Sequence, residues 1–148
     1  MWMYLGGHSS GGHLGGCVIM TDWDSFGIPG DVLKGALLGS GMYDLKPVRK
    51  SKRSNYVKFT DEMEQTLSVV RHIEKVRTPV VLPIGLSETP EFQRQSRDFA
   101  AALAKAGKPA ELIEAKGYNH YEMGETLGNP YEIMGRAALE MMRLTTAI

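Results

Sequence analysis

The sequence predicts an α/β fold in which a parallel sheet of about four strands is flanked by helices. Three observations lead to this prediction. Short apolar segments have the length of buried strands, segments of helical periodicity lie between them, and the connections are short. Strands that alternate with helices usually form a parallel sheet covered by those helices. The 148 residues suit one domain, residues 1–148, with a core of its own.

The expected strands and helices alternate along the whole chain. Apolar segments of strand length lie at residues 2–5, 36–38 (running into 39–41), 80–85 and 110–115. Segments with apolar residues at helical spacing lie at residues 13–20, 59–76, 91–106 and 130–144. Thr60, which is followed by two acidic residues, is typical of a helix start, and Gly107 is typical of a helix end.

The most informative motif is Gly-His-Ser-Ser-Gly at residues 7–11, directly after the first expected strand. The pattern G-x-S-x-G is typical of a nucleophile elbow, a sharp turn from a strand into a helix that exposes a serine hydroxyl. We expect Gly7 and Gly11 to lie where the two backbones approach too closely for a Cβ atom, and Ser9 to have a strained backbone. Ser9 is therefore the candidate nucleophile.

A serine hydroxyl needs a base within hydrogen-bond reach and a carboxylate that orients the base. After a nucleophile elbow these follow in the order acid, then histidine, each after a strand. His120, in the loop after the last expected strand, is the candidate base. Glu88, after the third expected strand, is the candidate acid. Glu91 is the alternative, but we expect it to open the next helix, where its charge favours the helix dipole. The backbone N–H of Ser10 is expected to be one oxyanion donor.

The remaining polar and aromatic candidates have structural interpretations. His8 is expected to pack or hydrogen-bond locally, and Asp44 is expected to fix a loop. His13 and His72 lie within expected helices. Neither the histidines nor the cysteine and acidic residues have the spacing of zinc ligands, so we expect no metal or organic cofactor. No substrate-binding residue is assigned. Four aromatic side chains are expected either to line the substrate site or to pack in the core, namely Tyr43, Tyr118, Tyr121 and Trp23.

The composition excludes several classes of function. Lys and Arg together number 17, as do Asp and Glu, so no basic surplus favours nucleic-acid binding. Five cations within residues 46–53 are expected to form a solvated loop. No apolar run reaches the roughly 18 residues of a membrane span, and the first residues show no signal-peptide pattern. The single cysteine, Cys17, excludes an intrachain disulfide and is expected to be a buried small hydrophobe in a cytoplasmic protein.

Four segments occur in a characteristic order. They read Gly-His-Ser-Ser-Gly-Gly-His-Leu at 7–14, Ser-Gly-Met-Tyr-Asp-Leu at 40–45, Glu-Thr-Pro-Glu-Phe-Gln-Arg-Gln-Ser at 88–96 and Gly-Tyr-Asn-His-Tyr-Glu at 117–122. Together they resemble the arylformamidase-like (kynurenine formamidase-like) branch of the α/β-hydrolase superfamily, which also holds carboxylesterases. The resemblance covers nearly the whole chain and implies a nucleophile at Ser9, an acid at Glu88 and a base at His120. Relatives often have aspartate as the acid.

Hydrolases of this branch are roughly twice as long, and the chain resembles only their C-terminal half. The resemblance therefore implies that the strand before the elbow lies at the edge of the sheet. It also implies that the loop that normally brings a second oxyanion donor belongs to the half that the resemblance does not cover. Because an unpaired apolar edge is a liability, we expect a homo-oligomer or a partner chain to cover it.

Two functions are consistent with these residues. The first is a serine hydrolase that cleaves small carboxylic esters or N-formyl amides through a Ser-His-Glu triad and an acyl-enzyme. The second is a non-catalytic remnant of such a hydrolase, or a subunit that needs a partner chain, because the loss of one oxyanion donor typically costs about 10²–10³ in turnover.

Overall fold

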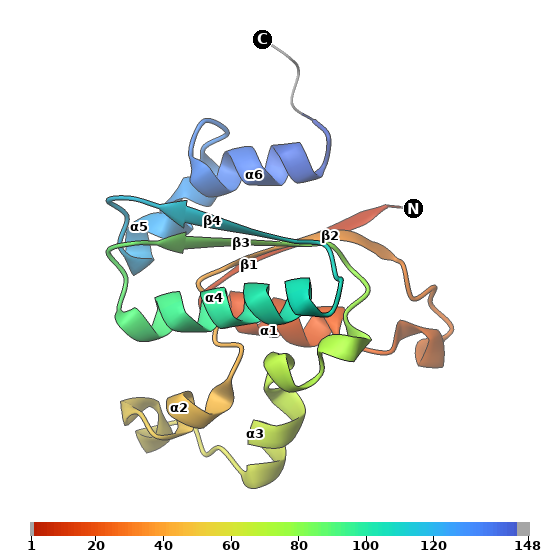
Figure 1. The fold of residues 1–148 in the computed structure, drawn as a ribbon, viewed down its shortest axis with the longest axis vertical. Coiled ribbons are helices and arrows are strands. Elements are labelled where there is room, and N and C mark those ends of the chain that lie inside the picture. Colours follow the sequence, from red (N-terminus) through yellow and green to blue (C-terminus); the bar gives the residue numbers. More distant parts are fainter. Residues whose placement is uncertain (1, 145–148) are drawn as a thin grey trace.

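The computed structural model describes residues 2–144, and its centre is a four-stranded parallel sheet (Figure 1). Neighbouring strands pair in the order β1-β2-β3-β4, and every pair is parallel. The carboxyl ends of the strands therefore all lie at the same end of the sheet. The predicted α/β fold with a parallel sheet is confirmed. The strands are β1 (Met3–His8), β2 (Leu33–Gly39), β3 (Val80–Gly85) and β4 (Ala110–Ala115).

Helices cover both faces of the sheet. Figure 1 shows α1 (Ser10–Ile19) and α4 (Pro90–Lys105) below the sheet, α6 (Ile133–Met141) above it, and α5 (His120–Glu125) at the carboxyl ends of the strands. The helices α1 and α4 lie close to where the sequence predicts them. As predicted, Gly107 follows α4 with a positive φ of 68°, a conformation that ends helices and that glycine adopts freely.

Two predictions near the C-terminus were wrong. His120 is not in a loop but is the first residue of α5, because Asn119 and Glu122 form a reciprocal capping box around the helix start. The last helix begins at Ile133 rather than at residue 130. Asn129 precedes a proline and is extended, with φ −119° and ψ 115°, as the proline ring favours.

The long helix predicted over residues 59–76 is interrupted. The structure has α3 (Asp61–Leu67) followed by two 3₁₀ turns, η3 (Val69–Arg71) and η4 (Ile73–Lys75). Thr60 caps α3 as predicted, since its side chain accepts a hydrogen bond from Met63 N. The helix ends at Ser68, whose hydroxyl donates to Glu64 O and accepts from Leu45 N. This contact with a distant segment turns the chain and buries Val69.

Besides α5, four shorter helical segments were not predicted. They are η1 (Trp23–Phe26), α2 (Leu45–Arg49), η2 (Lys52–Asn55) and η5 (Thr126–Gly128). The cationic residues 46–53 therefore form a short helix and a 3₁₀ turn, not a loop. Asp44 fixes the start of α2, because its Oδ1 accepts a hydrogen bond from Lys46 N. Figure 1 shows α2 and α3 on the side of α1 and α4 that is remote from the sheet.

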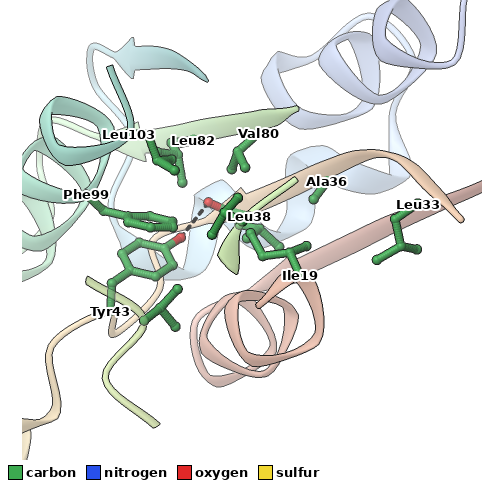
Figure 2. Close-up of a cluster of buried hydrophobic side chains, with 11 residues drawn as sticks. Ile19, Leu33, Ala36, Leu38, Tyr43, Val80, Leu82, Phe99 and Leu103 are labelled. Atoms are coloured by element: carbon green, nitrogen blue, oxygen red, sulfur yellow. Dashed lines mark hydrogen bonds between the residues drawn. The ribbon is translucent and has the colours of Figure 1, made fainter. Parts of the chain in front are cut away.

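The main core lies between the sheet and the pair α1 and α4 (Figure 2). Tyr43 stacks on Phe99 with ring centroids 4.4 Å apart, and its hydroxyl donates a 2.8 Å hydrogen bond to Leu38 O. Full burial raises the pKa of Tyr43 well above its usual range, so this donor stays protonated. Successive strand residues point to opposite faces. Leu37 accordingly joins a second cluster beneath α5 and α6 with Ala115, Met123, Met134 and Ala137.

The strand β1 forms one edge of the sheet. Among the described residues, no strand pairs with its outer side. Trp2 is 72% exposed and Met3 is 40% exposed at its beginning. This is the edge position that the resemblance implies.

No helix within residues 2–144 is both long enough and apolar enough to cross a bilayer.

Candidate active site

Ser9 lies at the tip of the turn between β1 and α1, at the carboxyl ends of the strands. Its backbone has φ 58° and ψ −120°, a strained conformation for a residue with a Cβ atom. The Ser9 N–H donates a 2.9 Å hydrogen bond to Gly39 O at the end of β2. The expected strain is present, and this backbone contact with β2 fixes the position of the turn.

The glycines around Ser9 divide into two kinds. A Cβ atom on Gly7 would lie 2.3 Å from Gly11 O, so strand and helix do approach there as predicted. A Cβ atom on Gly11 would meet nothing within 4 Å, so the prediction for Gly11 was wrong. The glycine of α1 that meets the backbone of β2 is Gly12 instead, where a Cβ atom would lie 2.8 Å from Gly39 O.

The structure brings Ser9, His120 and Glu88 into one chain of hydrogen bonds. His120 Nε2 lies 2.8 Å from Ser9 Oγ, and His120 Nδ1 lies 2.7 Å from Glu88 Oε2. A carboxylate only accepts hydrogen bonds, so the proton of the neutral ring is on Nδ1. Nε2 is then free to accept the serine proton. This is the geometry that a nucleophilic serine requires.

Glu88, rather than the alternative Glu91, contacts the histidine. Glu91 lies in the first turn of α4, where it forms an ion pair with Arg94 at 2.7 Å and accepts a hydrogen bond from Gln95. Glu88 follows the carboxyl end of β3. Its side chain is buried, with 6% of the residue exposed.

Two donors hold the second oxygen of Glu88. Its Oε1 accepts hydrogen bonds from Ser40 Oγ at 2.5 Å and from Gly85 N at 2.8 Å. Burial alone would raise the pKa of Glu88. Hydrogen bonds from His120, Ser40 and Gly85 outweigh this effect and hold the pKa below its usual range, so the carboxylate is ionised at neutral pH.

Sequence reasoning did not assign Ser40 to the site. It directly follows β2, is fully buried and has φ 47°, an uncommon value for a serine. Two signals were available. Ser40 opens the segment 40–45 of the resemblance, and it directly follows a strand, where the residues after parallel strands come together. Neither its φ nor its contact with Glu88 can be read from the neighbouring residues.

Three rings surround His120. Phe92 stacks on it with a centroid distance of 4.2 Å, His8 lies at 4.7 Å, and Tyr121 meets it edge-on at 5.9 Å. Sequence reasoning placed Phe92 in the segment 88–96 of the resemblance and in the helix expected over residues 91–106, but not beside the histidine. Burial, followed by the nearby charge of His120, lowers the pKa of His8, which favours the neutral form of that ring.

The other histidines lie in structural contacts. The Nε2 atoms of His13 and His72 lie 2.9 Å from the carbonyl oxygens of Leu67 and Gln65, respectively. The thiol of Cys17 lies 3.6 Å from His13 Nε2, and burial raises its pKa. Within residues 2–144, no group of three or more His, Cys, Asp or Glu side chains is arranged to hold a metal ion.

Of the four aromatic candidates, only Tyr121 lies beside the triad, and it is 82% exposed. Tyr43 packs in the core. Tyr118 donates a 2.6 Å hydrogen bond to Glu132, and the Trp23 indole N–H donates to Val18 O. These three side chains have structural roles in the described part of the chain.

The backbone N–H of Ser10 is available to an anion. Ser10 is the first residue of α1, and the first N–H groups of a helix have no acceptor within it. These groups also form the positive end of the helix dipole. A negative charge that develops next to Ser9 would therefore be stabilised there.

No protein-family model matches the chain. Its sequence is 28% identical over 145 residues to a kynurenine formamidase from Danio rerio, a match that covers 95% of this chain and 49% of the relative. It is 29% identical over 146 residues to a kynurenine formamidase from Salmo salar, with the same coverage. The chain thus spans about half the length of the curated relatives that it matches.

Solved structures share the fold at lower sequence identity. A thioesterase-like protein from Silicibacter, described as a putative thioesterase, superposes with a TM-score of 0.71 at 23% identity over 86% of this chain and 46% of its own. An acylaminoacyl peptidase from Pyrococcus horikoshii gives 0.70 at 19% identity over 95% and 23%. Esterase 2 from Thermogutta terrifontis gives 0.65 at 20% identity over 98% and 56%. These likenesses establish the fold.

Proposed function

We propose that this chain, which has an α/β-hydrolase fold and distant kynurenine formamidase homologues, is a serine hydrolase of small carboxylic esters or N-formyl amides. One observation carries the proposal. Ser9, His120 and Glu88 come from three separate segments and form one continuous chain of hydrogen bonds. The strained backbone of Ser9 supports it, because such strain concentrates at functional sites.

The first half of the reaction acylates Ser9. As Ser9 Oγ attacks the carbonyl carbon of the substrate, His120 Nε2 takes the hydroxyl proton. The Glu88 carboxylate holds the ring in place and stabilises the imidazolium that forms. The carbonyl oxygen becomes negatively charged, and the Ser10 N–H donates a hydrogen bond to it. The tetrahedral intermediate collapses when His120 Nε2 gives its proton to the leaving alcohol or amine.

The second half releases the acid. A water molecule gives a proton to His120 Nε2 and attacks the acyl carbon. The C–O bond to Ser9 breaks, the proton returns from His120 to Ser9 Oγ, and the enzyme is restored. The chain's own residues provide the nucleophile of the first half and the base and orienting acid of both halves, and water is the nucleophile of the second half.

Two substrate classes fit this chemistry. The formamidase relatives favour an N-formyl amide, and the esterase among the structural neighbours favours a carboxylic ester. Both are attacked at a carbonyl carbon by the same three groups. Aryl esters and N-formylkynurenine are therefore the first substrates to test.

Labelling with a fluorophosphonate tests the nucleophile directly. We expect the purified chain to gain one probe per molecule in an intact-mass measurement, and Ser9→Ala to gain none. Ser87→Ala is the control, because Ser87 is an exposed serine directly before the acid, and it should label like the wild type. Folded wild-type protein that does not label would contradict an autonomous hydrolase.

We further propose that the outer edge of β1 pairs with a strand from a second copy or from another polypeptide. The edge is unpaired among the described residues, and the apolar side chains of Trp2 and Met3 are exposed beside it. Such an edge readily accepts a further strand. Because β1 ends next to Ser9, an added strand would also place its own loop near the oxyanion.

Light scattering combined with the rate of labelling tests this second proposal. Self-association should make the labelling rate per molecule rise with protein concentration. Met3→Lys should weaken both the self-association and this rise in labelling rate. Phe26→Lys changes another exposed apolar side chain, in η1, and should change neither the self-association nor the rise in labelling rate. A monomer that does not label indicates a different partner chain. A monomer that labels at a constant rate per molecule would rule the proposal out.

A further inference from the structure

The ring of Phe92 lies against the imidazole of His120. The two ring centroids are 4.2 Å apart and the ring planes are inclined by 27°, so the rings stack. Phe92 is half-buried and also packs against a small apolar cluster of Met42, Leu45 and Val48, which holds it from behind. The reaction proposed above uses this aromatic contact in none of its steps.

Phe92 and the acid Glu88 belong to one short segment that is tied together by a side chain. Gln93, next to Phe92 in the first turn of α4, donates hydrogen bonds from Nε2 to Glu88 O at 2.8 Å and to Leu86 O at 3.2 Å. The segment therefore presents two groups to His120, a carboxylate at Nδ1 and an aromatic face against the ring. The same contacts that fix the acid also fix the position of the Phe92 ring.

The Phe92 ring interacts differently with the two charge states of His120. The face of a phenyl ring carries a partial negative charge, and it attracts a cation within about 6 Å of its centroid. A neutral imidazole gains little from this attraction. In the proposed reaction, His120 becomes positively charged as it takes the proton of Ser9. The attraction is therefore stronger in the transition state than in the ground state, and such an interaction lowers the barrier.

Three other side chains with ionisable groups face the His120 ring. The ionised carboxylate of Glu88 lies 2.7 Å from Nδ1, and the centroid of His8, at the end of β1, lies 4.7 Å away. Burial lowers the pKa of His8, so that ring adds no positive charge beside the imidazole at neutral pH. Tyr121 of α5 meets the ring edge-on from an exposed position. The imidazolium would thus meet a carboxylate at one nitrogen and the face of Phe92 against its ring.

We propose that Phe92 is a positioning residue whose aromatic face stabilises the His120 imidazolium relative to the neutral imidazole. The inference rests on the proposed function and adds to it a residue outside the triad. Phe92 takes no part in proton transfer and acts through His120. Without the aromatic face, the neutral ring is favoured. The acid limb of the pH profile of kcat/KM, which reports protonation of the free base, should then move to lower pH. Looser packing alone would slow the reaction without this shift.

Fluorination of the Phe92 ring tests the charge effect with little change of shape. Fluorine withdraws electrons and weakens the negative face, so the comparison is between phenylalanine and its singly and triply fluorinated forms in place of Phe92. We expect the acid limb for phenyl acetate to move to lower pH with each step of fluorination. The trifluorinated ring should move it by about half a pH unit and slow turnover about threefold at the plateau. Phe92→Leu should move the limb at least as far.

Phe99 provides the matched control. It lies on the same helix, two turns after Phe92, and its ring stacks on Tyr43 with centroids 4.4 Å apart rather than on the histidine. Trifluorophenylalanine in place of Phe99 should leave the acid limb at its wild-type pH. A limb that stays in place when Phe92 is fluorinated, or that moves equally when Phe99 is, would overturn the inference while the hydrolase proposal stands.

An NMR titration of the His120 ring decides the question if the chain does not turn over the ester. The resonance is assigned by its absence in His120→Gln, and the measurement needs no substrate. We expect the titration midpoint to move to lower pH by about half a pH unit with trifluorinated Phe92 and to stay in place with trifluorinated Phe99. An unchanged midpoint with fluorinated Phe92 would overturn the inference. A shifted midpoint in an inactive chain would support the effect of Phe92 on the charge of His120 and count only against the hydrolase proposal.

Discussion

The hydroxyl of Ser40 donates a 2.5 Å hydrogen bond to Glu88 Oε1, across 48 residues of sequence. The other oxygen of the same carboxylate lies 2.7 Å from His120 Nδ1. Ser40 therefore acts on the histidine through the acid, by fixing the carboxylate plane. The residue is fully buried and has a φ of 47°, so its backbone is held in an unfavourable region at the place where this contact forms.

Removing this hydroxyl should reduce catalysis without removing any group of the triad. We expect Ser40→Ala to lower kcat towards an aryl ester about tenfold, because a hydrogen bond to a charged group contributes about 1.5–3 kcal/mol and Gly85 N still holds Oε1. Steady-state kinetics provide the measurement. Ser96→Ala is the control, since the Ser96 hydroxyl is also buried but has no hydrogen-bond partner in the described structure. Unchanged kcat in Ser40→Ala would show that the contact is dispensable.

The lowered pKa of the same carboxylate predicts how the free energy of unfolding depends on pH. The pKa of Glu88 is lower in the folded protein than its ordinary value, so ionised Glu88 stabilises the fold above the unfolded pKa of about 4.3. That contribution is lost as the pH falls through the folded pKa. We therefore expect the difference in free energy of unfolding between wild type and Glu88→Gln to decline as the pH drops below about 4. Urea unfolding at several pH values measures it, and a difference that grows towards acid pH would contradict the direction of the shift.

The strands were predictable because the signal is local. Residues 80–85 and 110–115 were expected as strands, and β3 and β4 have these bounds. The interruption after α3 was not predictable in this way. It depends on the Ser68 hydroxyl meeting Leu45 N, a contact across 23 residues that no periodicity contains. Local patterns thus gave the sheet, while the breaks in helices came from tertiary contacts.

The candidate site shows the same division. Ser9, Glu88 and His120 were selected by motif and by their order after strands, and the structure brings them within hydrogen-bond distance. Ser40 and Phe92 were not selected. Their importance lies in a φ value and in a ring stack on His120, both of which exist only after distant segments have packed together.

The strain at Ser9 predicts that glycine and alanine substitutions rank in opposite order of stability at Ser9 and at the adjacent Ser10. We expect Ser9→Gly to be more stable than Ser9→Ala by about 1 kcal/mol, because glycine adopts φ 58° without a Cβ clash. Ser10 is the first residue of α1 and has a helical backbone, which alanine adopts at a smaller cost in conformational entropy than glycine. Ser10→Ala should therefore be more stable than Ser10→Gly. Chemical unfolding of the four variants gives the comparison, and a preference for alanine at Ser9 would contradict the strained turn.

Two neighbouring glycines in α1 separate helix propensity from close packing. Gly11→Ala places a Cβ atom in open space within a helix, so we expect it to stabilise the protein by about 0.5–1 kcal/mol. Gly12→Ala would put the same atom 2.8 Å from Gly39 O and 3.1 Å from Gly41 Cα. Relief of these backbone contacts requires a shift, and we expect a loss of about 1–3 kcal/mol.

The position of that clash gives Gly12→Ala a second readout. Gly39 O is the atom that accepts the hydrogen bond from Ser9 N, so displacing it moves the turn that carries the nucleophile. We expect Gly12→Ala to slow labelling by a fluorophosphonate under conditions where the protein is fully folded, and Gly11→Ala to label at the wild-type rate. Thermal unfolding and the labelling rate of the two variants provide the measurements. If Gly12→Ala were destabilised but labelled normally, the contact between α1 and β2 would support the fold without positioning Ser9.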